Sequence, residues 1–281
     1  MCRTLFKAAM AVLCLIQSYC AFAQSPLPNA FAHNDYFNKH PLHDALTNGY
    51  TSIEADVFLT GKNLVVAHIN PYFKAHRKLE NLYLKPLLDQ IITNNGQVYK
   101  NYNHPITLLI DIKSDANDTY RALKPLLEKY RVILTSYDDG KVTLGAVTIV
   151  ISGHKPYDLI KGESKRLAFI DKDLRQPTRD TAFTNVYTMA SCKYSKLVKW
   201  NGYGSFPEVE KQRLLDYVSL AHLRGEKVRL WASPENSVVW DELLKCGVDM
   251  INTNKLVALK KFLTTNAIDY IDPLIASNNS F

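Results

Sequence analysis

Residues 52–68, SIEADVFLTGKNLVVAH, contain the local pattern from which the fold and its centre can be inferred. Side chains alternate across a strand, so Glu54 and Asp56 point to one face and the apolar residues around them point to the other. Gly61 permits a tight turn, and the apolar run after it ends at His68. The stretch therefore predicts a strand, a turn and a short return strand that bring two carboxylates and an imidazole together.

The two carboxylates have a structural and a functional interpretation. A single Glu-x-Asp pair is more often the solvent-facing side of an amphipathic strand. Here, however, the return strand places His68 at the end where Glu54 and Asp56 lie. Carboxylate oxygens suit a hard divalent cation, Mg²⁺ or Ca²⁺, and an imidazole can transfer protons near neutral pH. We therefore expect this end of the strand to be an active-site core that binds a divalent cation.

Apolar runs of strand length alternate with helical patterns along the rest of the chain. Residues 107–113 form an almost continuous apolar run, which is typical of a parallel strand buried on both faces. The predicted strands are residues 31–35, the start of 52–68, 107–113, 147–152, 167–171, 186–190, 228–232 and 249–254, and the predicted helices include 41–46, 118–130, 207–224 and 237–245. This alternation predicts an α/β fold, a TIM-type (β/α)8 barrel, with residues 69–105 as an insertion after the second strand.

The first 23 residues have the features of a secretory signal peptide. A short basic segment with Arg3 and Lys7 precedes an apolar run over residues 8–16, and an A-x-A cleavage motif follows at 21–23. The apolar run is too short to span a bilayer. We therefore expect residues 24–281 to form a single exported barrel domain, secreted or periplasmic, without a stable membrane anchor.

Charge and cysteine content narrow the possible partners. The formal charge of +7 becomes +5 without Arg3 and Lys7, and the basic residues are scattered along the chain. Scattered positive charge mildly favours anionic substrates and argues against dedicated nucleic-acid binding. Of the five cysteines, only Cys192 and Cys246 follow the predicted signal peptide, which allows one disulfide but no disulfide framework. We expect a monomer that binds a small-molecule or lipid substrate.

Ordered motifs along the chain resemble those of a known superfamily. They are His33-Asn34-Asp35, the SIEADV segment, His68 and the IDIK segment at 110–113. This set is similar to the glycerophosphodiester phosphodiesterase and phosphatidylinositol-specific phospholipase C superfamily. The segments AHNDY at 32–36 and LENLYLKPL at 79–87 resemble those of a branch that includes the altered inheritance of mitochondria protein. In a TIM-type barrel, the strand ends where these motifs fall are the place of catalysis.

The resemblance implies a role for each matching residue. Glu54, Asp56 and Asp111 match the divalent-metal ligands of the superfamily, and His33 and His68 match its acid/base pair. Three carboxylates can hold Mg²⁺ or Ca²⁺ through oxygen, and the cation would neutralise charge that grows on phosphate oxygens. One imidazole would take a proton from the attacking hydroxyl while the other gives a proton to the leaving oxygen.

Three further positions are implied to bind substrate. Lys113 matches the lysine near the phosphate, and Trp231 lies where the superfamily often places a tryptophan against the substrate. Asn34 stands where glycerophosphodiesterases usually have an arginine that helps to hold phosphate. Asp111 stands where they usually have glutamate, and in this it resembles the venom-type sphingomyelinase D branch.

The implied function is that of a phosphoric diester hydrolase. Such an enzyme would hydrolyse or cyclise a glycerophosphodiester, a lysophospholipid or a related phosphodiester of lipid metabolism. One alternative is a non-catalytic or weakly active protein that binds a phosphoryl ligand through its metal, and Asn34 in place of arginine favours it. Another is a glycoside hydrolase, which would use paired carboxylates but leaves two histidines and a lysine without a role. Fold alone does not decide among the three.

Overall fold

The computed structural model describes residues 25–69, 75–176 and 185–265. The predicted signal peptide, residues 1–23, lies outside these ranges. Within them, no helix combines the length and the apolar character that crossing a membrane requires.

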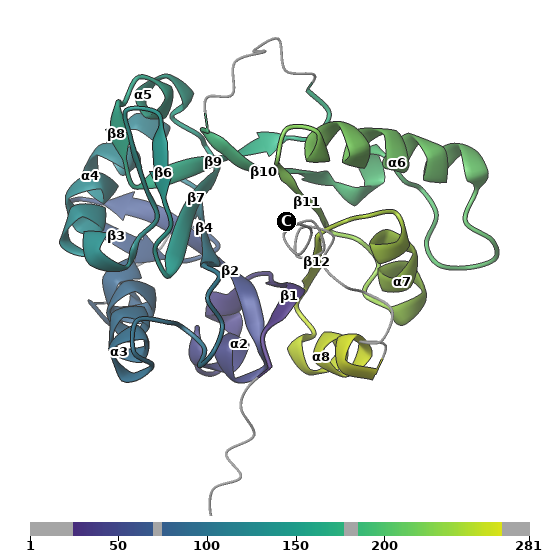
Figure 1. Cartoon of the computed structure of the whole chain (residues 1–281), viewed down its shortest axis with the longest axis horizontal. Helices are drawn as coiled ribbons and strands as arrows, with labels where there is room; N and C mark the ends of the chain where they lie inside the picture. Colours follow the sequence, from purple (N-terminus) through teal and green to yellow (C-terminus); the bar gives the residue numbers. More distant parts are fainter. Residues whose placement is uncertain (1–24, 70–74, 177–184, 266–281) are drawn as a thin grey trace, which may run out of the picture.

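Eight parallel strands of the described residues close into a barrel (Figure 1). Each strand pairs with the barrel strand before it in the chain, and β1 pairs with both β2 and β12, which completes the ring. The strands are β1 (Leu27–Ala32), β2 (Tyr50–Thr60), β4 (Ile106–Ile112), β7 (Val147–Gly153), β9 (Ala168–Asp173), β10 (Tyr187–Lys193), β11 (Lys227–Trp231) and β12 (Met250–Thr253). The predicted TIM-type (β/α)8 barrel is confirmed.

Helices cover the outside of the barrel (Figure 1). They are α2 (His43–Thr47), α3 (Lys85–Thr93), α4 (Ala116–Lys129), α5 (Tyr157–Lys161), α6 (Glu208–His222), α7 (Ser237–Lys245) and α8 (Leu256–Thr265). The shorter elements are the helical turns η1 (Asp35–Phe37), η2 (Ala75–Arg77), η3 (Glu80–Leu84), η4 (Arg131–Ile133) and η5 (Tyr194–Lys196), and a small sheet of β5 (Ser136–Asp138), β6 (Lys141–Thr143) and β8 (Lys165–Arg166). Two of these helices begin with a side-chain cap. The Asp115 side chain accepts a hydrogen bond from the backbone N–H of Asp118 at the start of α4. The Asn236 side chain does the same with Val239 at the start of α7.

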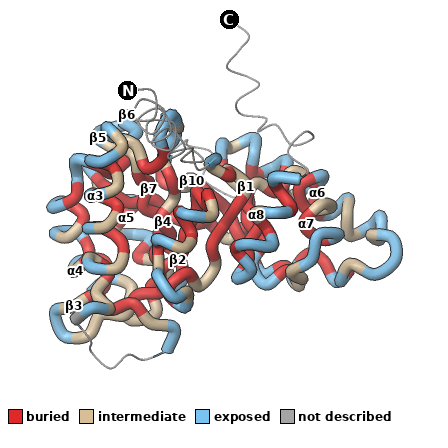
Figure 2. The backbone as a smooth tube through the Cα atoms, turned by 90° about the horizontal axis from the view of Figure 1, so that it is seen from below, coloured by how far each residue is buried: buried red, intermediate tan, exposed pale blue. Residues whose placement is uncertain are grey.

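The inside of the barrel is apolar at one level and polar at the next. The apolar level is a separate buried cluster made of Phe31, Leu109, Val150, Met189 and Met250. Two residues further along their strands, side chains on the same face are polar, because alternation returns every second residue to the interior. Figure 2 shows the barrel strands as the most buried part of the chain. Cys192, on β10, and Cys246 are both buried, and their thiols are free.

The first strand begins earlier than the sequence predicts. The prediction was residues 31–35, whereas β1 ends at Ala32 and His33 follows it directly. Pro28 and Asn29, inside the true strand, belong to residue types that are depleted in strands, so the pattern before Ala30 is weak. The shift places His33 at the open end of the barrel.

The stretch that opens with Ser52 forms the predicted hairpin. The end of β2 pairs antiparallel with β3 (Asn63–Val66), and Val57 lies opposite Val66. The turn contains Gly61 at a φ of 60°, a conformation that glycine adopts without strain. The return strand ends at Val66, two residues earlier than the predicted end at His68.

The insertion after the second strand is tied to the loop after β1. Within residues 69–105, its described elements are η2, η3 and α3. Tyr83 of η3 donates a hydrogen bond of 3.0 Å to buried Asp35, which also accepts from the backbone of Leu42 at 2.6 Å and the side chain of Asn38 at 3.0 Å. Burial raises the pKa of Asp35, and these donors counter part of that rise. Asp35 thus has a structural role within the His-Asn-Asp motif.

A titratable pair on the barrel exterior should make stability depend on pH. His222 Nε2 lies 2.8 Å from Asp249 Oδ2, and this hydrogen bond raises the pKa of His222 above 6.5. The stabilisation is therefore complete below about pH 6.5 and is lost as pH rises through the folded-state pKa. We expect His222→Gln to destabilise the protein at pH 5.5 by less than about 1 kcal/mol and to have little effect at pH 8.5.

Urea unfolding of the wild type and the variant at both pH values measures this difference. His76→Gln, at an exposed histidine, is the control and should show no such difference. A loss of stability that is equal at pH 5.5 and 8.5 would contradict the assignment.

Candidate active site

Three carboxylates meet at the carboxyl ends of two adjacent strands. Glu54 and Asp56 lie on β2, and Asp111 lies on β4 directly opposite Asp56. One oxygen from each residue lies within 4.8 Å of the other two. Burial raises the pKa of Glu54 to about 7 and also raises the pKa of Asp56.

Each of these carboxylates has a buried oxygen without a hydrogen-bond partner. The atoms are Glu54 Oε2, Asp56 Oδ1 and Asp111 Oδ1. Buried polar atoms in proteins normally have partners, so three such oxygens in one place require an explanation. A hard cation that prefers oxygen ligands would satisfy all three, and the donor set therefore fits Mg²⁺ or Ca²⁺.

Gly153 makes room for the Asp111 carboxylate. It ends β7 at a φ of 67°, where an added Cβ would lie 1.9 Å from Asp111 Oδ1 and 2.4 Å from the Ile112 carbonyl oxygen. Any side chain at this position would displace either the Asp111 carboxylate or the backbone of β4. Glycine is therefore required for the observed position of this carboxylate.

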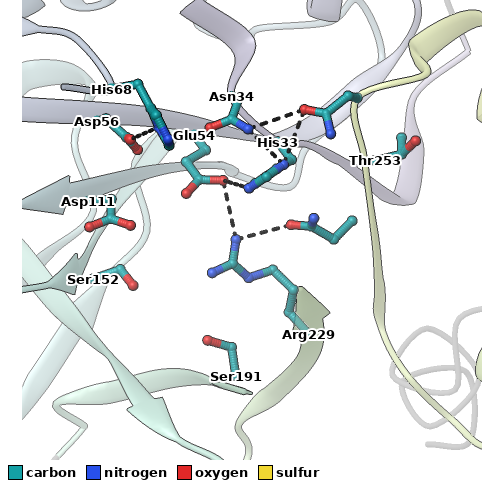
Figure 3. Close-up of polar contacts among 12 residues, drawn as sticks. His33, Asn34, Glu54, Asp56, His68, Asp111, Ser152, Ser191, Arg229 and Thr253 are labelled. Carbon is teal, nitrogen blue, oxygen red and sulfur yellow. Dashed lines mark hydrogen bonds and ion pairs between the residues drawn. The ribbon is translucent and has the colours of Figure 1, made fainter. Parts of the chain in front are cut away.

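His33 lies beside the carboxylates at the end of β1. Its Nδ1 is 3.1 Å from Asn254 Oδ1 and 3.0 Å from Asn34 Nδ2, and its Nε2 is 3.8 Å from Glu54 Oε2 (Figure 3). Burial, assisted by the positive charge of Arg229, lowers the pKa of His33 to about 4. The imidazole is therefore neutral at pH 7.

His68 lies on the other side of the carboxylates. Its Nδ1 is 3.1 Å from Asp56 Oδ2 and 3.0 Å from the Tyr36 hydroxyl, and the side chain is 52% exposed. Tyr36 is buried, and its hydroxyl also lies 2.6 Å from Asn34 Oδ1 and 2.8 Å from Asp56 Oδ2. Tyr36 therefore links Asn34, Asp56 and His68, although sequence reasoning assigned it no role.

Lys113 supplies positive charge next to the carboxylates. Its Nζ lies 2.9 Å from Asp111 Oδ2 and 3.2 Å from Asp56 Oδ2. Burial lowers the pKa of Lys113, but the two carboxylates outweigh burial and the net shift is upward. Trp231 ends β11 at the rim and is 38% exposed.

A cavity of about 560 Å³ opens at this end of the barrel. Seven of the eight site residues predicted from sequence line it, namely His33, Asn34, Glu54, His68, Asp111, Lys113 and Trp231. The eighth, Asp56, is buried next to Asp111 and is within hydrogen-bond distance of His68. The structure thus brings all eight predicted residues to one place.

The structure adds a buried guanidinium that sequence reasoning missed. Arg229 NH1 lies 3.5 Å from Glu54 Oε2 and donates to Asn252 Oδ1 at 3.3 Å (Figure 3). Arg229 NH2 lies 3.6 Å from Asp171 Oδ2. The guanidinium carbon is 4.3 Å from the centre of the Phe31 ring. The available signal was the position of Arg229, two residues before Trp231 and so on the same face of its strand.

Asp171 is held in turn by two serines. Its Oδ2 accepts hydrogen bonds from Ser152 Oγ at 3.1 Å and Ser191 Oγ at 2.5 Å. Burial raises the pKa of Asp171, and the charge of Arg229 counters this rise. Asp171 therefore fixes the guanidinium on the side away from Glu54.

Comparison with known proteins gives a family match and a fold match. A model of the AIM6-like phosphodiesterase domain matches residues 24–171. The chain is 32% identical to altered inheritance of mitochondria protein 6 of Eremothecium gossypii, over 84% of this chain and 69% of that protein. It is 27% identical to the protein of that name from Lachancea thermotolerans, over 82% of this chain and 64% of that protein.

Among solved structures, a glycerophosphodiester phosphodiesterase from Parabacteroides distasonis has a similar fold. The TM-score is 0.53 at 15% identity, and the match covers 86% of this chain and 99% of that one. This likeness agrees with the barrel described above.

The buried guanidinium should be essential for stability. Arg229→Met leaves Glu54 and Asp171 buried without their cation, and we expect a loss of about 3–5 kcal/mol in the free energy of unfolding at pH 8. The loss should be smaller at pH 5, because the unpaired carboxylates can then bind protons. Denaturant unfolding at the two pH values measures it.

The control for this experiment is Arg121→Met, which removes an exposed ion pair with Asp118. Its effect should stay below about 1 kcal/mol at both pH values. An Arg229→Met variant as stable as Arg121→Met would show that the buried charges do not depend on the guanidinium.

Proposed function

The chain belongs to the AIM6-like phosphodiesterase family, and from this premise we propose that it is a metal-dependent phosphoric diester hydrolase. The main support is the group of three carboxylates beside two imidazoles, each of which offers one oxygen within 4.8 Å of the other two. Each of these carboxylates also has a buried oxygen without a hydrogen-bond partner. The proposed substrate is a glycerophosphodiester, a lysophospholipid or a related phosphodiester. The proposal includes export to the periplasm or the medium and action as a monomer, without a nucleic-acid partner.

Glu54, Asp56 and Asp111 would hold the divalent cation, Mg²⁺ or Ca²⁺. When bound, the cation supplies positive charge that stabilises the phosphate oxygens as negative charge grows on them. Lys113, which already contacts two of these carboxylates, would place its ammonium group beside the same oxygens.

Asn34 carries no positive charge, but Arg229 brings a positive charge to the cavity from another strand. Asn34 offers only a neutral amide to a phosphate. Arg229 lines the same cavity from β11, within 3.5 Å of Glu54. The charge of Arg229 therefore weakens the case, based on Asn34, for a protein that binds a phosphoryl ligand without hydrolysing it.

The two histidines would divide the proton transfers between them. With Nδ1 protonated and donating to Asn254 Oδ1, His33 has its Nε2 lone pair free on the side of Glu54, so it can accept a proton from water or from a neighbouring substrate hydroxyl. His68, held through Nδ1 next to Asp56, has Nε2 free to give a proton to the leaving oxygen. Tyr36 would fix the orientation of His68.

Geometry favours this function over the two alternatives. Glycosidases use two carboxyl groups separated by about 5–9.5 Å, with the substrate or a water between them. Here three carboxylate oxygens lie within 4.8 Å and two imidazoles flank them. Burial lowers the pKa of His33 to about 4, so its imidazole is neutral at pH 7. A protein that only bound phosphate would gain more from a protonated, positively charged imidazole.

Metal affinity should depend on Gly153 as well as on the ligands. Glu54→Gln and Asp111→Asn should each weaken Mg²⁺ or Ca²⁺ binding at least about tenfold, and Gly153→Ala should do the same because its Cβ displaces the Asp111 carboxylate. Titration calorimetry of the purified protein with each cation measures the affinity.

Gly140→Ala is the matched control for this prediction. Gly140 also has a positive φ, of 96°, but nothing lies within 4 Å of its added Cβ. It therefore reproduces the backbone strain without the clash. Equal affinities in Gly153→Ala and the wild type would remove Asp111 from the metal site.

The pH dependence of turnover should separate the two histidines. On bis-p-nitrophenyl phosphate, the rate of the wild type should follow a bell-shaped profile. His33→Ala should lose the acidic limb and His68→Ala the basic limb, each with a loss of about 10²–10⁴-fold near neutral pH. Wild-type turnover in both variants would refute the acid/base assignment.

A further inference from the structure

The cavity has an excess of basic side chains. Six basic residues line it, Lys113, Lys155, Arg175, Lys193, Lys196 and Arg229, against four acidic residues, Glu54, Asp111, Asp171 and Asp173. The proposed divalent cation would add two positive charges, and a phosphodiester brings one negative charge. Excess positive charge therefore remains even with both in place.

Ion pairs account for three of the six basic residues. Lys113 pairs with Asp111 and Asp56, Arg229 pairs with Glu54 and Asp171, and Arg175 pairs with Asp173 at 2.7 Å. In residues 25–69, 75–176 and 185–265, no carboxylate lies within 4 Å of the ammonium groups of the remaining three. These are Lys155, Lys193 and Lys196.

The three lysines lie at the ends of two barrel strands, β7 and β10, which are separated by β9. Lys193 ends β10, opposite Trp231 of β11, and its Nζ lies 5.8 Å from the centre of the Trp231 ring. Ser191, two residues earlier on the same face, points into the barrel and bonds to Asp171. Lys193 therefore lies directly above the barrel interior.

One of the other two lysines follows β7, and the other follows β10 directly after Lys193. Lys155 follows β7 and donates to the backbone oxygen of Asp171 at 2.9 Å, which holds its ammonium at the rim. Lys196 ends the helical turn η5 after β10 and is exposed. The lysine side of the cavity thus extends from β7 over β9 to β10, next to the Trp231 ring on β11. The carboxylates on this side, Asp171 and Asp173, are paired with Arg229 and Arg175.

We propose that this lysine side, Lys155, Lys193 and Lys196, binds an anionic group on the alcohol portion of the substrate. The proposal rests on the proposed function, because it places the scissile phosphodiester at the carboxylates and histidines. The group would be a carboxylate or a phosphate, since several ammonium groups can donate hydrogen bonds to its oxygens. The Trp231 ring would cover the short apolar segment between the two anions.

Two compounds that differ by one carboxylate test the proposal. Glycerophosphoserine has a carboxylate that glycerophosphoethanolamine lacks, and the two share the same scissile phosphodiester. We expect kcat/KM for the serine compound to exceed that for the ethanolamine compound by about tenfold at low salt. The preference should fall to about one in the Lys193→Gln/Lys196→Gln double variant.

Lys199→Gln is the control, because Lys199 is exposed near these residues but does not line the cavity. It should retain the preference of the wild type. The proposal is overturned if the wild type shows no preference, or if the double variant keeps it.

If neither compound is hydrolysed, the anion site can still be tested independently of turnover. Calorimetry in the presence of EDTA then measures how tightly each of the two compounds binds. Tighter binding of glycerophosphoserine that the double variant abolishes would support the anion site and count against turnover of these diesters. Equal binding of both compounds by the wild type would overturn the anion site.

Discussion

A guanidinium buried between two carboxylates holds the polar level of the barrel together. Arg229 of β11 approaches Glu54 of β2 and Asp171 of β9 at 3.5 and 3.6 Å, above the Phe31 ring. A buried charge without a partner is strongly destabilising, so Glu54 and Asp171 can remain ionised inside the barrel only as part of a compensated set. The positions of the candidate metal ligands therefore depend on Arg229, which is not itself a candidate ligand.

Residues two positions apart on a barrel strand lie on the same face, and this spacing recurs in the site. On three strands an inward residue at the polar level is followed, two positions later, by a residue of different chemistry at the rim. These pairs are Asp111 and Lys113, Ser191 and Lys193, and Arg229 and Trp231. Alternation of side chains makes this stacking automatic once the strands are parallel and in register. The apolar cluster beneath gives the polar level a rigid base.

The barrel and three site residues, Glu54, Asp56 and His68, could be predicted because their patterns are local. The other five site residues were implied by resemblance to a known superfamily. Glu54 and Asp56 are two residues apart, and the turn to His68 is short. Arg229 and Tyr36 could not be assigned, because their roles arise from contacts with residues distant in the chain that no local pattern encodes. For the same reason, Asn34 alone suggested a loss of positive charge, whereas Arg229 brings a cation into the cavity from another strand.

The closure of the barrel between β1 and β12 determines when the site can exist during protein synthesis. His33 and Asn254, which contact each other across this junction, are 221 positions apart. A growing chain on the ribosome exposes its acidic residues first, while β1 has one unpaired edge and Arg229 has not yet been made. A product truncated before β12 would lack Asn252 and Asn254 and would leave one edge of β1 without its partner strand, so it could not hold the complete site.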